Sequence, residues 1–276
     1  MAQGETQVQR WRRRCLTIPG FGLLATAYAC LLLVALPIAV VFDLAAGRRM
    51  ATSRALLAVA LYLACEVAGL LAAGLLWLVV RPLTSAHAYA TANYRLQRRW
   101  AQALLRGATR IFGMRVSVHG AEDIGPGPVL LFVRHASTID TLLAANFVGP
   151  VEPFRLRYVI KRELLWDPCL DVVGQRLPNV FIRRGEGGGE AEIAAIRELA
   201  RDVDAGEGVL IYPEGTRATP AKQRRALERI AALDADRLDR VSGLRHVLPP
   251  RYGGPLGLIE ERSDADVVVL THVGFD

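Results

Sequence analysis

Two long uncharged stretches, residues 15–42 and 55–80, constrain the fold of this chain more than any other feature. The first contains no charged residue, and the second contains only Glu66. Each is longer than the roughly 20 apolar residues that cross a bilayer as a helix, and the first is too long for the apolar segment of a secretory signal peptide. The sequence therefore predicts two membrane-embedded helices, which either cross the bilayer or form a re-entrant hairpin bent at Pro37.

Arginine residues flank both stretches and predict an orientation. Four lie between residues 10 and 14, and four more follow the second stretch between residues 81 and 99. The connecting loop carries three arginines together with Asp43. By the positive-inside rule both ends of the hairpin face the cytoplasm. We therefore expect the rest of the chain on the cytoplasmic side of a membrane, the inner membrane of a bacterium.

Glu66 lies in the middle of the second stretch, where an ionised carboxylate is costly. One interpretation is a proton or ion path through the membrane. The other is a protonated or paired side chain that contacts the neighbouring helix. Two predicted spans leave little room for a path, which favours the second interpretation.

The formal net charge of +7 is concentrated in one segment. Residues 81–119 contain seven arginines and no acidic residue. Within them, residues 93–112 place Leu96, Trp100 and other apolar side chains at helical spacing, with arginines on the opposite side. For the segment 83–112 we expect a basic amphipathic helix that lies among anionic membrane lipids. An ordinary domain helix with a solvated basic face is the alternative, and no nucleic-acid partner is expected because no DNA- or RNA-binding motif is present.

The remaining two thirds of the chain predict one α/β domain with a mixed sheet. Short apolar runs bounded by turn residues alternate with helical patterns, which is typical of a sheet with flanking helices. The expected strands are residues 114–119, 129–133, 157–160, 180–182, 209–212 and 267–271. The expected helices are residues 190–205 and 221–241. The whole chain is then a membrane-embedded helical hairpin (1–82), a basic helix (83–112) and an α/β domain (113–276).

Composition and cysteine spacing exclude several other classes. An apolar content of 52% excludes a disordered chain. The four cysteines, Cys15, Cys30, Cys65 and Cys169, show no CxxC or zinc-ligand spacing. We therefore expect no disulfide framework, no metal site and a reducing compartment for the α/β domain.

The first pattern with chemical meaning is H-x4-D, from His135 to Asp140, directly after the apolar run 129–133. In a continuous helix the two side chains would point about 140° apart. If Ser137 caps a helix instead, His135 lies in the preceding turn and its imidazole can fold back onto Asp140. The carboxylate then holds one ring nitrogen and leaves the other as a general base. Taken alone the pattern is common, and a capping or core role is the alternative.

The second pattern is Pro-Glu-Gly-Thr-Arg at residues 213–217, which ends the apolar run 209–212. Gly215 permits a sharp turn there. Thr216 and nearby backbone N–H groups can donate hydrogen bonds, and Arg217 can bind a phosphate group through two N–H groups. The alternative is an ordinary strand-to-loop turn with an exposed ion pair.

The third pattern is a strand-like run, Asn179 followed by the apolar residues 180–182, that ends in Arg183 and Arg184. Guanidinium groups at a strand end suit an anionic headgroup. A solvated strand end is the alternative for this pattern.

Taken together and in this order, the blocks resemble the glycerolipid acyltransferase family, the lysophospholipid acyltransferases of the 1-acyl-glycerol-3-phosphate acyltransferase type. The family's ordered blocks are H-x4-D, F-[IV]-x-R, [FY]-P-E-G-T-R and an apolar stretch with proline. They match residues 135–140, 181–184, 212–217 and 247–250. Lys161 is similar to the family's lysine between the first two blocks. Arg134 is a departure, because many members have Asn before the histidine.

The resemblance implies an O-acyltransferase in which His135 is the general base and Asp140 stabilises its imidazolium. It implies no metal and no cofactor. The substrate-binding residues that it implies are Lys161, Arg183, Arg184, Glu214, Gly215, Thr216 and Arg217.

The implied substrates are an acyl thioester and a lipid alcohol. The donor is acyl-CoA or acyl-carrier protein. The acceptor is a lysophospholipid, in the first place 1-acyl-glycerol-3-phosphate, which gives phosphatidic acid. A different acceptor (glycerol-3-phosphate, a lyso-ornithine lipid or another lysophospholipid), a thioesterase and a non-catalytic lipid-binding homologue stay open. The absence of a G-x-S-x-G pattern argues against a serine hydrolase, and the sequence predicts no oligomeric state.

Overall fold

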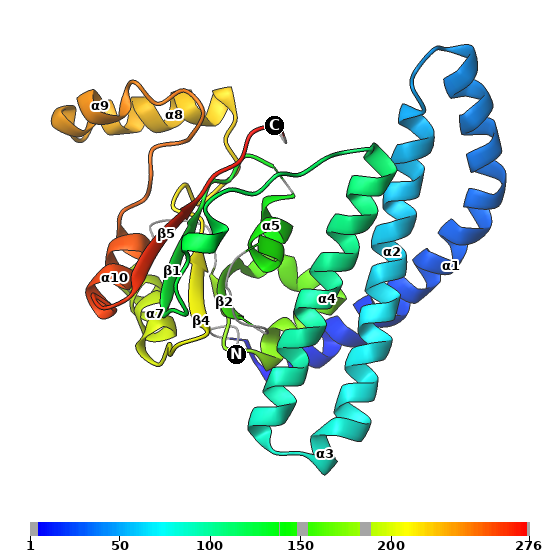
Figure 1. The fold of residues 1–276 in the computed structure, drawn as a ribbon, viewed down its shortest axis with the longest axis horizontal. Coiled ribbons are helices and arrows are strands. Elements are labelled where there is room, and N and C mark those ends of the chain that lie inside the picture. Colours follow the sequence, from blue (N-terminus) through cyan, green and yellow to red (C-terminus); the bar gives the residue numbers. More distant parts are fainter. Residues whose placement is uncertain (1–4, 138, 148–153, 183–188, 275–276) are drawn as a thin grey trace. The chain divides into compact units, whose positions relative to one another are not determined.

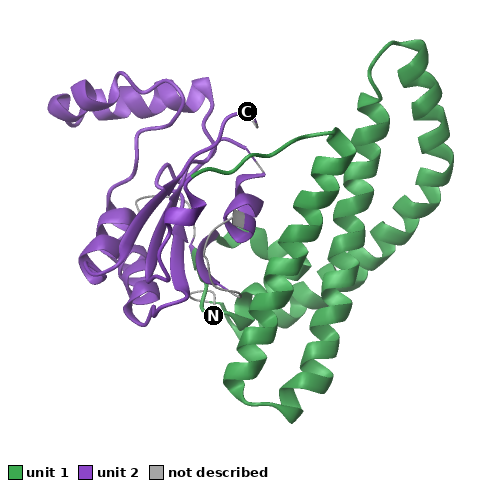
Figure 2. Ribbon diagram, in the orientation of Figure 1, with its two compact units in different colours: residues 1–119, 161–181 green, residues 120–160, 182–276 purple. Residues whose placement is uncertain are grey.

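The fold is known from a computed structural model of residues 1–276, which describes all of them except 1–4, 138, 148–153, 183–188 and 275–276. The chain forms two compact units (Figure 2). The first comprises residues 1–119 and 161–181, and the second comprises residues 120–160 and 182–276. This division differs from the three segments expected from the sequence, because residues 161–181 group with the N-terminal helices.

Long helices build the first unit (Figure 1). They are α1 (Gln7–Ala45), α2 (Ala51–Leu75) and α4 (Ala86–Phe112). A π-helical turn, η1 (Leu76–Val80), continues α2 into α3 (Arg81–Leu83). α1 packs against α2, and α4 packs against α2.

The two predicted apolar helices are present. Gln7–Ala45 and Ala51–Leu83 are long and apolar enough to cross a membrane, by length and composition. Only 6% and 22% of their apolar windows are buried inside the protein. Large apolar side chains such as Leu23, Leu33 and Val41 are therefore exposed along α1, whereas the core helix of a soluble domain buries such side chains.

The apolar stripe of α4 is covered by protein. Trp100 packs at Gly69 of α2, where an added Cβ would lie 3.2 Å from Cδ1 of the indole. Ala101, Leu104 and Leu105 are buried. The arginines of the opposite side, Arg95, Arg99, Arg106 and Arg110, are exposed. This arrangement is what the alternative interpretation, an ordinary packed helix with a solvated basic face, predicts.

Residues 161–181 complete the first unit. They form η3 (Arg162–Trp166), α6 (Pro168–Val172) and η4 (Gly174–Arg176). Val172, Val173 and Leu177 share a buried apolar cluster with Ala73 of α2 and Tyr94 of α4. These contacts join sequence positions that no local pattern connects.

Two buried acids hold this segment against the long helices. Asp171 of α6 binds both Arg13 and Arg14 of α1, with Oδ1 at 2.8 Å from Nη2 of Arg13 and Oδ2 at 3.2 Å from Nε of Arg14. Glu66 is fully buried, and its Oε2 accepts a hydrogen bond from the backbone N–H of Cys169 at 3.2 Å. Glu66 is therefore paired, but its partner is α6 rather than a neighbouring apolar helix.

The second unit carries most of a five-stranded sheet with the order β3-β2-β4-β1-β5, because Lys161, Val180 and Phe181 of that sheet group with the first unit. The strands of the sheet are β1 (Val129–Val133), β2 (Arg155–Lys161), β3 (Val180–Ile182), β4 (Glu207–Ile211) and β5 (Asp266–Leu270). β1 pairs with β4 and with β5, and β2 pairs with β4, all in parallel. The α/β class is thus confirmed.

Helices α5 (Asp140–Phe147), α7 (Glu190–Arg201) and α10 (Gly253–Glu261) lie beside the strands of this sheet (Figure 1). Helices α8 (Pro220–Ala231) and α9 (Ala235–Val241) pack on each other away from the strands. α7 and α10 pack together and contact β4 and β1. Ala144 of α5 shares a buried core with Val129, Leu131 and Val133, which are alternate residues of β1.

Three sequence expectations were wrong in detail. Residues 114–119 alternate like a strand but form none in the structure. The helix expected over 190–205 ends at Arg201. The single helix expected over 221–241 is two helices, because Asp234 accepts a hydrogen bond from the backbone N–H of Arg237 and starts α9 as a new helix.

Candidate active site

The carboxyl-terminal ends of three neighbouring strands meet at one edge of the sheet. β4, β1 and β5 are adjacent and parallel, so the residues that follow them lie side by side. β1 is followed by Arg134 and His135, β4 by Tyr212 and Glu214, and β5 by His272. Strand order therefore unites the H-x4-D and P-E-G-T-R blocks, which are far apart in the sequence.

Asp140, the first residue of α5, closes the loop that follows β1. Its Oδ2 accepts hydrogen bonds from the backbone N–H groups of Ala136 and Ser137, both at 2.7 Å. The imidazole of His135 folds back onto the same oxygen, with Nδ1 at 3.2 Å. The carboxylate of Asp140 thus collects the N–H groups of Ala136 and Ser137, while the Ser137 hydroxyl, the cap expected from the sequence, accepts the N–H of Ile139 at 3.4 Å.

The His135–Asp140 pair has the surroundings that a general base needs. The side chain of Asp140 is fully buried, whereas 15% of the His135 side chain is exposed. Burial alone would raise the pKa of the Asp140 carboxyl, but hydrogen bonds from His135 and the loop N–H groups, with the charge of His272, outweigh burial and lower this pKa. Asp140 is therefore charged at neutral pH. A neutral His135 that donates Nδ1–H to it keeps the lone pair of Nε2 for a substrate proton.

A second histidine contacts Asp140, and no sequence pattern indicated it. Nε2 of His272 lies 2.7 Å from Oδ1 of Asp140, and only 6% of the His272 side chain is exposed. His272 follows β5 and reaches the site because β5 pairs with β1. A polar residue directly after an apolar strand was the available signal, but the position of that strand beside β1 could not be read from the sequence.

Glu214 joins two loops at the site. Its Oε1 accepts a hydrogen bond from the backbone N–H of His135 at 3.0 Å, and its Oε2 accepts one from the backbone N–H of Leu248 at 3.1 Å. Burial raises the pKa of the Glu214 carboxyl, although these hydrogen bonds oppose the rise. The centroid of the Tyr212 ring lies 4.5 Å from the centroid of the His135 imidazole. Both carboxylate oxygens of Glu214 thus bind backbone N–H groups of the protein. Through them the P-E-G-T-R block is joined to the H-x4-D block and to the apolar stretch 247–250.

The rest of the P-E-G-T-R block forms a tight, partly exposed turn. Gly215 has φ of +69°, a conformation that favours glycine, and its N–H donates to the carbonyl of Tyr212 at 2.8 Å. Nζ of Lys222 in α8 lies 2.9 Å from Oγ1 of Thr216 and 3.1 Å from the carbonyl oxygen of Arg217. Arg217 itself is exposed. Lys222 was not among the predicted residues, and its place one turn into the helix that follows the block is the signal that was missed.

Arg134, the departure from the family pattern, has a structural role. Its Nη1 donates to the backbone carbonyl of His272 at 2.5 Å, and its Nε donates to the backbone carbonyl of His246 at 3.1 Å. Its own backbone N–H donates to the carbonyl of Leu270 at 2.9 Å. The residue before the site histidine therefore fixes the segment that carries the second histidine.

Three other predicted residues are not brought to this site by the described structure. Lys161 ends β2 and is grouped with the first unit. Arg183 and Arg184 lie outside the described residues. Over the described ranges, no group of three or more His, Cys, Asp or Glu side chains is arranged to hold a metal ion.

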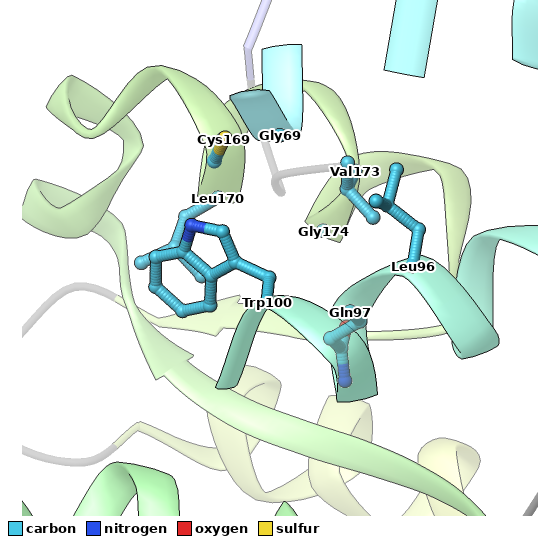
Figure 3. Close-up of a pocket in the computed structure, with 8 residues that line it drawn as sticks. All are labelled: Gly69, Leu96, Gln97, Trp100, Cys169, Leu170, Val173 and Gly174. Carbon is cyan, nitrogen blue, oxygen red and sulfur yellow. The ribbon is translucent and has the colours of Figure 1, made fainter. Parts of the chain in front are cut away.

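The first unit contains a separate small pocket (Figure 3). Trp100 and Leu96 of α4 face Cys169 and Val173 across it, and Gly69 of α2 lies at its margin. Its lining is almost entirely apolar.

The chain is similar to known acyltransferases. Residues 115–249 match the family model described as Acyltransferase. Over these residues the chain is therefore similar to the acyltransferase family. The matched residues include the H-x4-D and P-E-G-T-R blocks, whereas His272 lies beyond them.

One curated relative supports the assignment. The chain is 31% identical over 131 residues to the 1-acyl-sn-glycerol-3-phosphate acyltransferase of Pseudomonas aeruginosa. The matched part covers 46% of this chain and 47% of that protein, so the chain spans about half the length of the relative. No solved structure matches the chain significantly.

Proposed function

We propose that the chain is a membrane-bound O-acyltransferase. It transfers a fatty acyl group from acyl-CoA or acyl-carrier protein to the free hydroxyl of a lysophospholipid, and its acceptor is 1-acyl-glycerol-3-phosphate, which gives phosphatidic acid. The observation that carries the proposal is the partly exposed imidazole of His135 on the fully buried carboxylate of Asp140, inside a segment that is similar to the acyltransferase family.

The geometry supports a direct transfer with one general base. Nε2 of His135 removes the proton of the acceptor hydroxyl while the hydroxyl oxygen attacks the thioester carbonyl carbon. Asp140 stabilises the imidazolium that forms. The tetrahedral intermediate then collapses, the C–S bond breaks, and the leaving thiolate takes the proton from the imidazolium. The products are the acylated lipid and a free thiol, with His135 neutral again.

The phosphate of the acceptor needs cations at the mouth of the site. Arg217 is exposed on the turn that follows β4, and Lys222 holds that turn through Thr216. We assign the phosphate to Arg217, with Arg184 and Lys161 as further cations from the family pattern. Glu214 then acts as a positioning residue, because its two oxygens already bind backbone N–H groups.

The apolar helices support a membrane location. α1 and the Ala51–Leu83 helix are long enough to span a bilayer and bury little of their apolar surface in the protein. Arg10, Arg12, Arg13 and Arg14 at the start of α1 favour a cytoplasmic N-terminus, and the inner membrane of a bacterium fits this orientation. A lipid acceptor and a lipid product both dissolve in that membrane.

A panel of acceptors tests the proposal. Membranes that contain the protein are supplied with one radiolabelled acyl thioester and with 1-acyl-glycerol-3-phosphate, glycerol-3-phosphate, a lyso-ornithine lipid or lysophosphatidylcholine. We expect labelled phosphatidic acid to form fastest, with release of one thiol per acyl group transferred. Faster labelling of another acceptor replaces the acceptor in the proposal. Thiol release without a labelled lipid indicates a thioesterase. If no thiol is released from the acyl thioester with any of the acceptors, the enzymatic function is overturned.

A further inference from the structure

Asp140 lies between two imidazoles, and each of them contacts a different carboxylate oxygen. Oδ2 faces Nδ1 of His135 at 3.2 Å, and Oδ1 faces Nε2 of His272 at 2.7 Å. We propose that His272 is a positioning residue of the acyl transfer, which holds the Asp140 carboxylate through Oδ1 so that Oδ2 stays aimed at His135. The role in catalysis rests on the proposed function.

Burial of the carboxylate makes the partner of each oxygen important. Asp140 is fully buried, and Oδ2 alone receives the N–H groups of Ala136 and Ser137 and the imidazole of His135. Among the described contacts, His272 is the group at Oδ1. A buried carboxylate oxygen that loses its ion-pair partner is left unsolvated, which is costly, and the carboxylate relieves that cost by rotating away from His135. Loss of His272 is therefore expected to disturb the base and not only the fold.

The loop that carries the base also fixes His272. Arg134 precedes His135, and its guanidinium binds the backbone carbonyl of His272 at 2.5 Å. The backbone N–H of Arg134 binds the carbonyl of Leu270 at 2.9 Å, which continues the β1–β5 ladder one residue beyond Val133 and Leu270. Consecutive residues thus hold one histidine by its backbone and present the other one to the carboxylate.

The contact between His272 and Asp140 also has an electrostatic effect on His135. His272 draws part of the negative charge of Asp140 towards Oδ1, which weakens the stabilisation that the same carboxylate gives to a protonated His135. The other ionisable groups that face the site are Arg134 after β1, Tyr212 and Glu214 after β4, and Tyr158 of β2, which interacts with Tyr212. A substitution of His272 leaves all of these groups in the protein. Removal of the His272 imidazole should therefore shift the titration of His135 to higher pH, since the full carboxylate charge then falls on one imidazole.

A pair of amide substitutions separates positioning from packing. The amide nitrogen of Gln can occupy the place of Nε2, whereas the amide nitrogen of Asn occupies the place of Nδ1 and stops short of Asp140. We expect His272→Asn to lower kcat about 10-fold with the KM of both substrates within about twofold, because the base is misplaced and the substrates are still bound. We expect His272→Gln to regain at least about half of the wild-type kcat.

His246→Asn is the matched control. The His246 side chain is exposed and only its backbone carbonyl is used, by Arg134, so kcat should stay at the wild-type value. Equal loss of kcat in His272→Gln and His272→Asn overturns the positioning role, and so does an unchanged kcat in His272→Asn. If His272→Asn does not fold, Arg134→Met takes its place, since it removes the clamp on His272 and leaves both imidazoles. It should then lower kcat, and an unchanged value contradicts the proposal.

A titration of His135 by nuclear magnetic resonance completes the test and needs no substrate. The protein carries ¹⁵N-labelled histidine, and the signal of His135 is identified by its loss in His135→Asn. We expect its midpoint at higher pH in His272→Asn than in wild type, with His272→Gln close to wild type. An unmoved midpoint overturns the proposal. If the His135 midpoint is higher in His272→Asn but the wild-type protein transfers no acyl group, the proposed function is refuted while the contact between His272 and Asp140 is supported.

Discussion

Asp140 and Asp171 are both fully buried carboxylates, one in each compact unit, yet their surroundings suit them to different tasks. Asp140 is bound by two imidazoles and two backbone N–H groups. Asp171 is bound by the guanidinium groups of Arg13 and Arg14. An imidazole gains and loses a proton near neutral pH, whereas a guanidinium stays charged. The first carboxylate can therefore take part in proton transfer, and the second can only hold helices together.

The two aspartates teach that burial alone does not mark a catalytic acid. Each has several charge-assisted hydrogen bonds, and each joins chain segments that are distant in the sequence. What differs is the partner: a titratable ring with 15% of its side chain exposed at one site, and fixed cations at the other. The predictions that follow test this difference, from the largest expected effect to the smallest.

Asp140→Asn should abolish most of the activity. The neutral amide no longer stabilises a protonated His135, so acyl transfer is expected to fall by about 10²–10⁴-fold, the range of general-base contributions. Initial rates with 1-acyl-glycerol-3-phosphate and an acyl thioester measure the loss. Asp239→Asn, an exposed acid of α9, is the control and should keep the wild-type rate. A rate within about fivefold of wild type for Asp140→Asn removes Asp140 from the mechanism.

Asp171→Ala should reverse the pattern, with a large loss of stability and little loss of activity. The change leaves Arg14 without its carboxylate and leaves Arg13 with Glu5 alone, and the two arginine side chains are only 17% and 11% exposed. Breaking a buried ion pair from one side costs about 3 kcal/mol or more in the free energy of unfolding. Thermal unfolding in detergent measures the loss, and the transfer rate per folded molecule should stay within about twofold of wild type. An unchanged melting temperature shows that the arginines find other partners.

Acidification should reduce the difference in stability between wild type and Asp140→Asn, and this effect is smaller than the two effects above. The pKa of Asp140 is lowered in the folded protein because donors from His135 and the loop outweigh burial. Its carboxylate therefore stabilises the fold above the unfolded-state pKa of about 3.9, and this contribution is lost as the pH falls through the lowered folded-state value. The difference in melting temperature between the two proteins should shrink between about pH 5 and about pH 3. A difference that grows on acidification contradicts the assigned direction.

The sequence predicted the elements of this fold better than their partners. The strands at 129–133 and 180–182 have the expected bounds, since a short apolar run between turn residues is a local signal. Residues 114–119 gave the same local signal and form no strand, because pairing depends on a neighbouring strand that the pattern does not reveal. The same limit explains why α4 was expected among lipid headgroups although its apolar stripe packs on α2.

The candidate site shows the same division. The fold-back of His135 onto Asp140 was predictable because the two residues share one loop. The contact of His272 with Asp140 was not predictable, since it depends on strand order across more than a hundred residues of sequence. The contact of Glu214 with Leu248 was not predictable either, since it depends on a loop without a sequence pattern. Arg134 could be recognised as a departure from the family, but its contact with His272 needed the structure.

The central claim is that the imidazole of His135 removes the proton of the acceptor hydroxyl, and the transfer rate of His135→Ala tests it most directly. Membranes with equal amounts of wild type, His135→Ala and the exposed-histidine control His119→Ala are supplied with 1-acyl-glycerol-3-phosphate and an acyl thioester. The account predicts that His135→Ala loses at least about 10²-fold in rate, while His119→Ala matches wild type and all three proteins melt at similar temperatures. Undiminished transfer by folded His135→Ala would contradict the account.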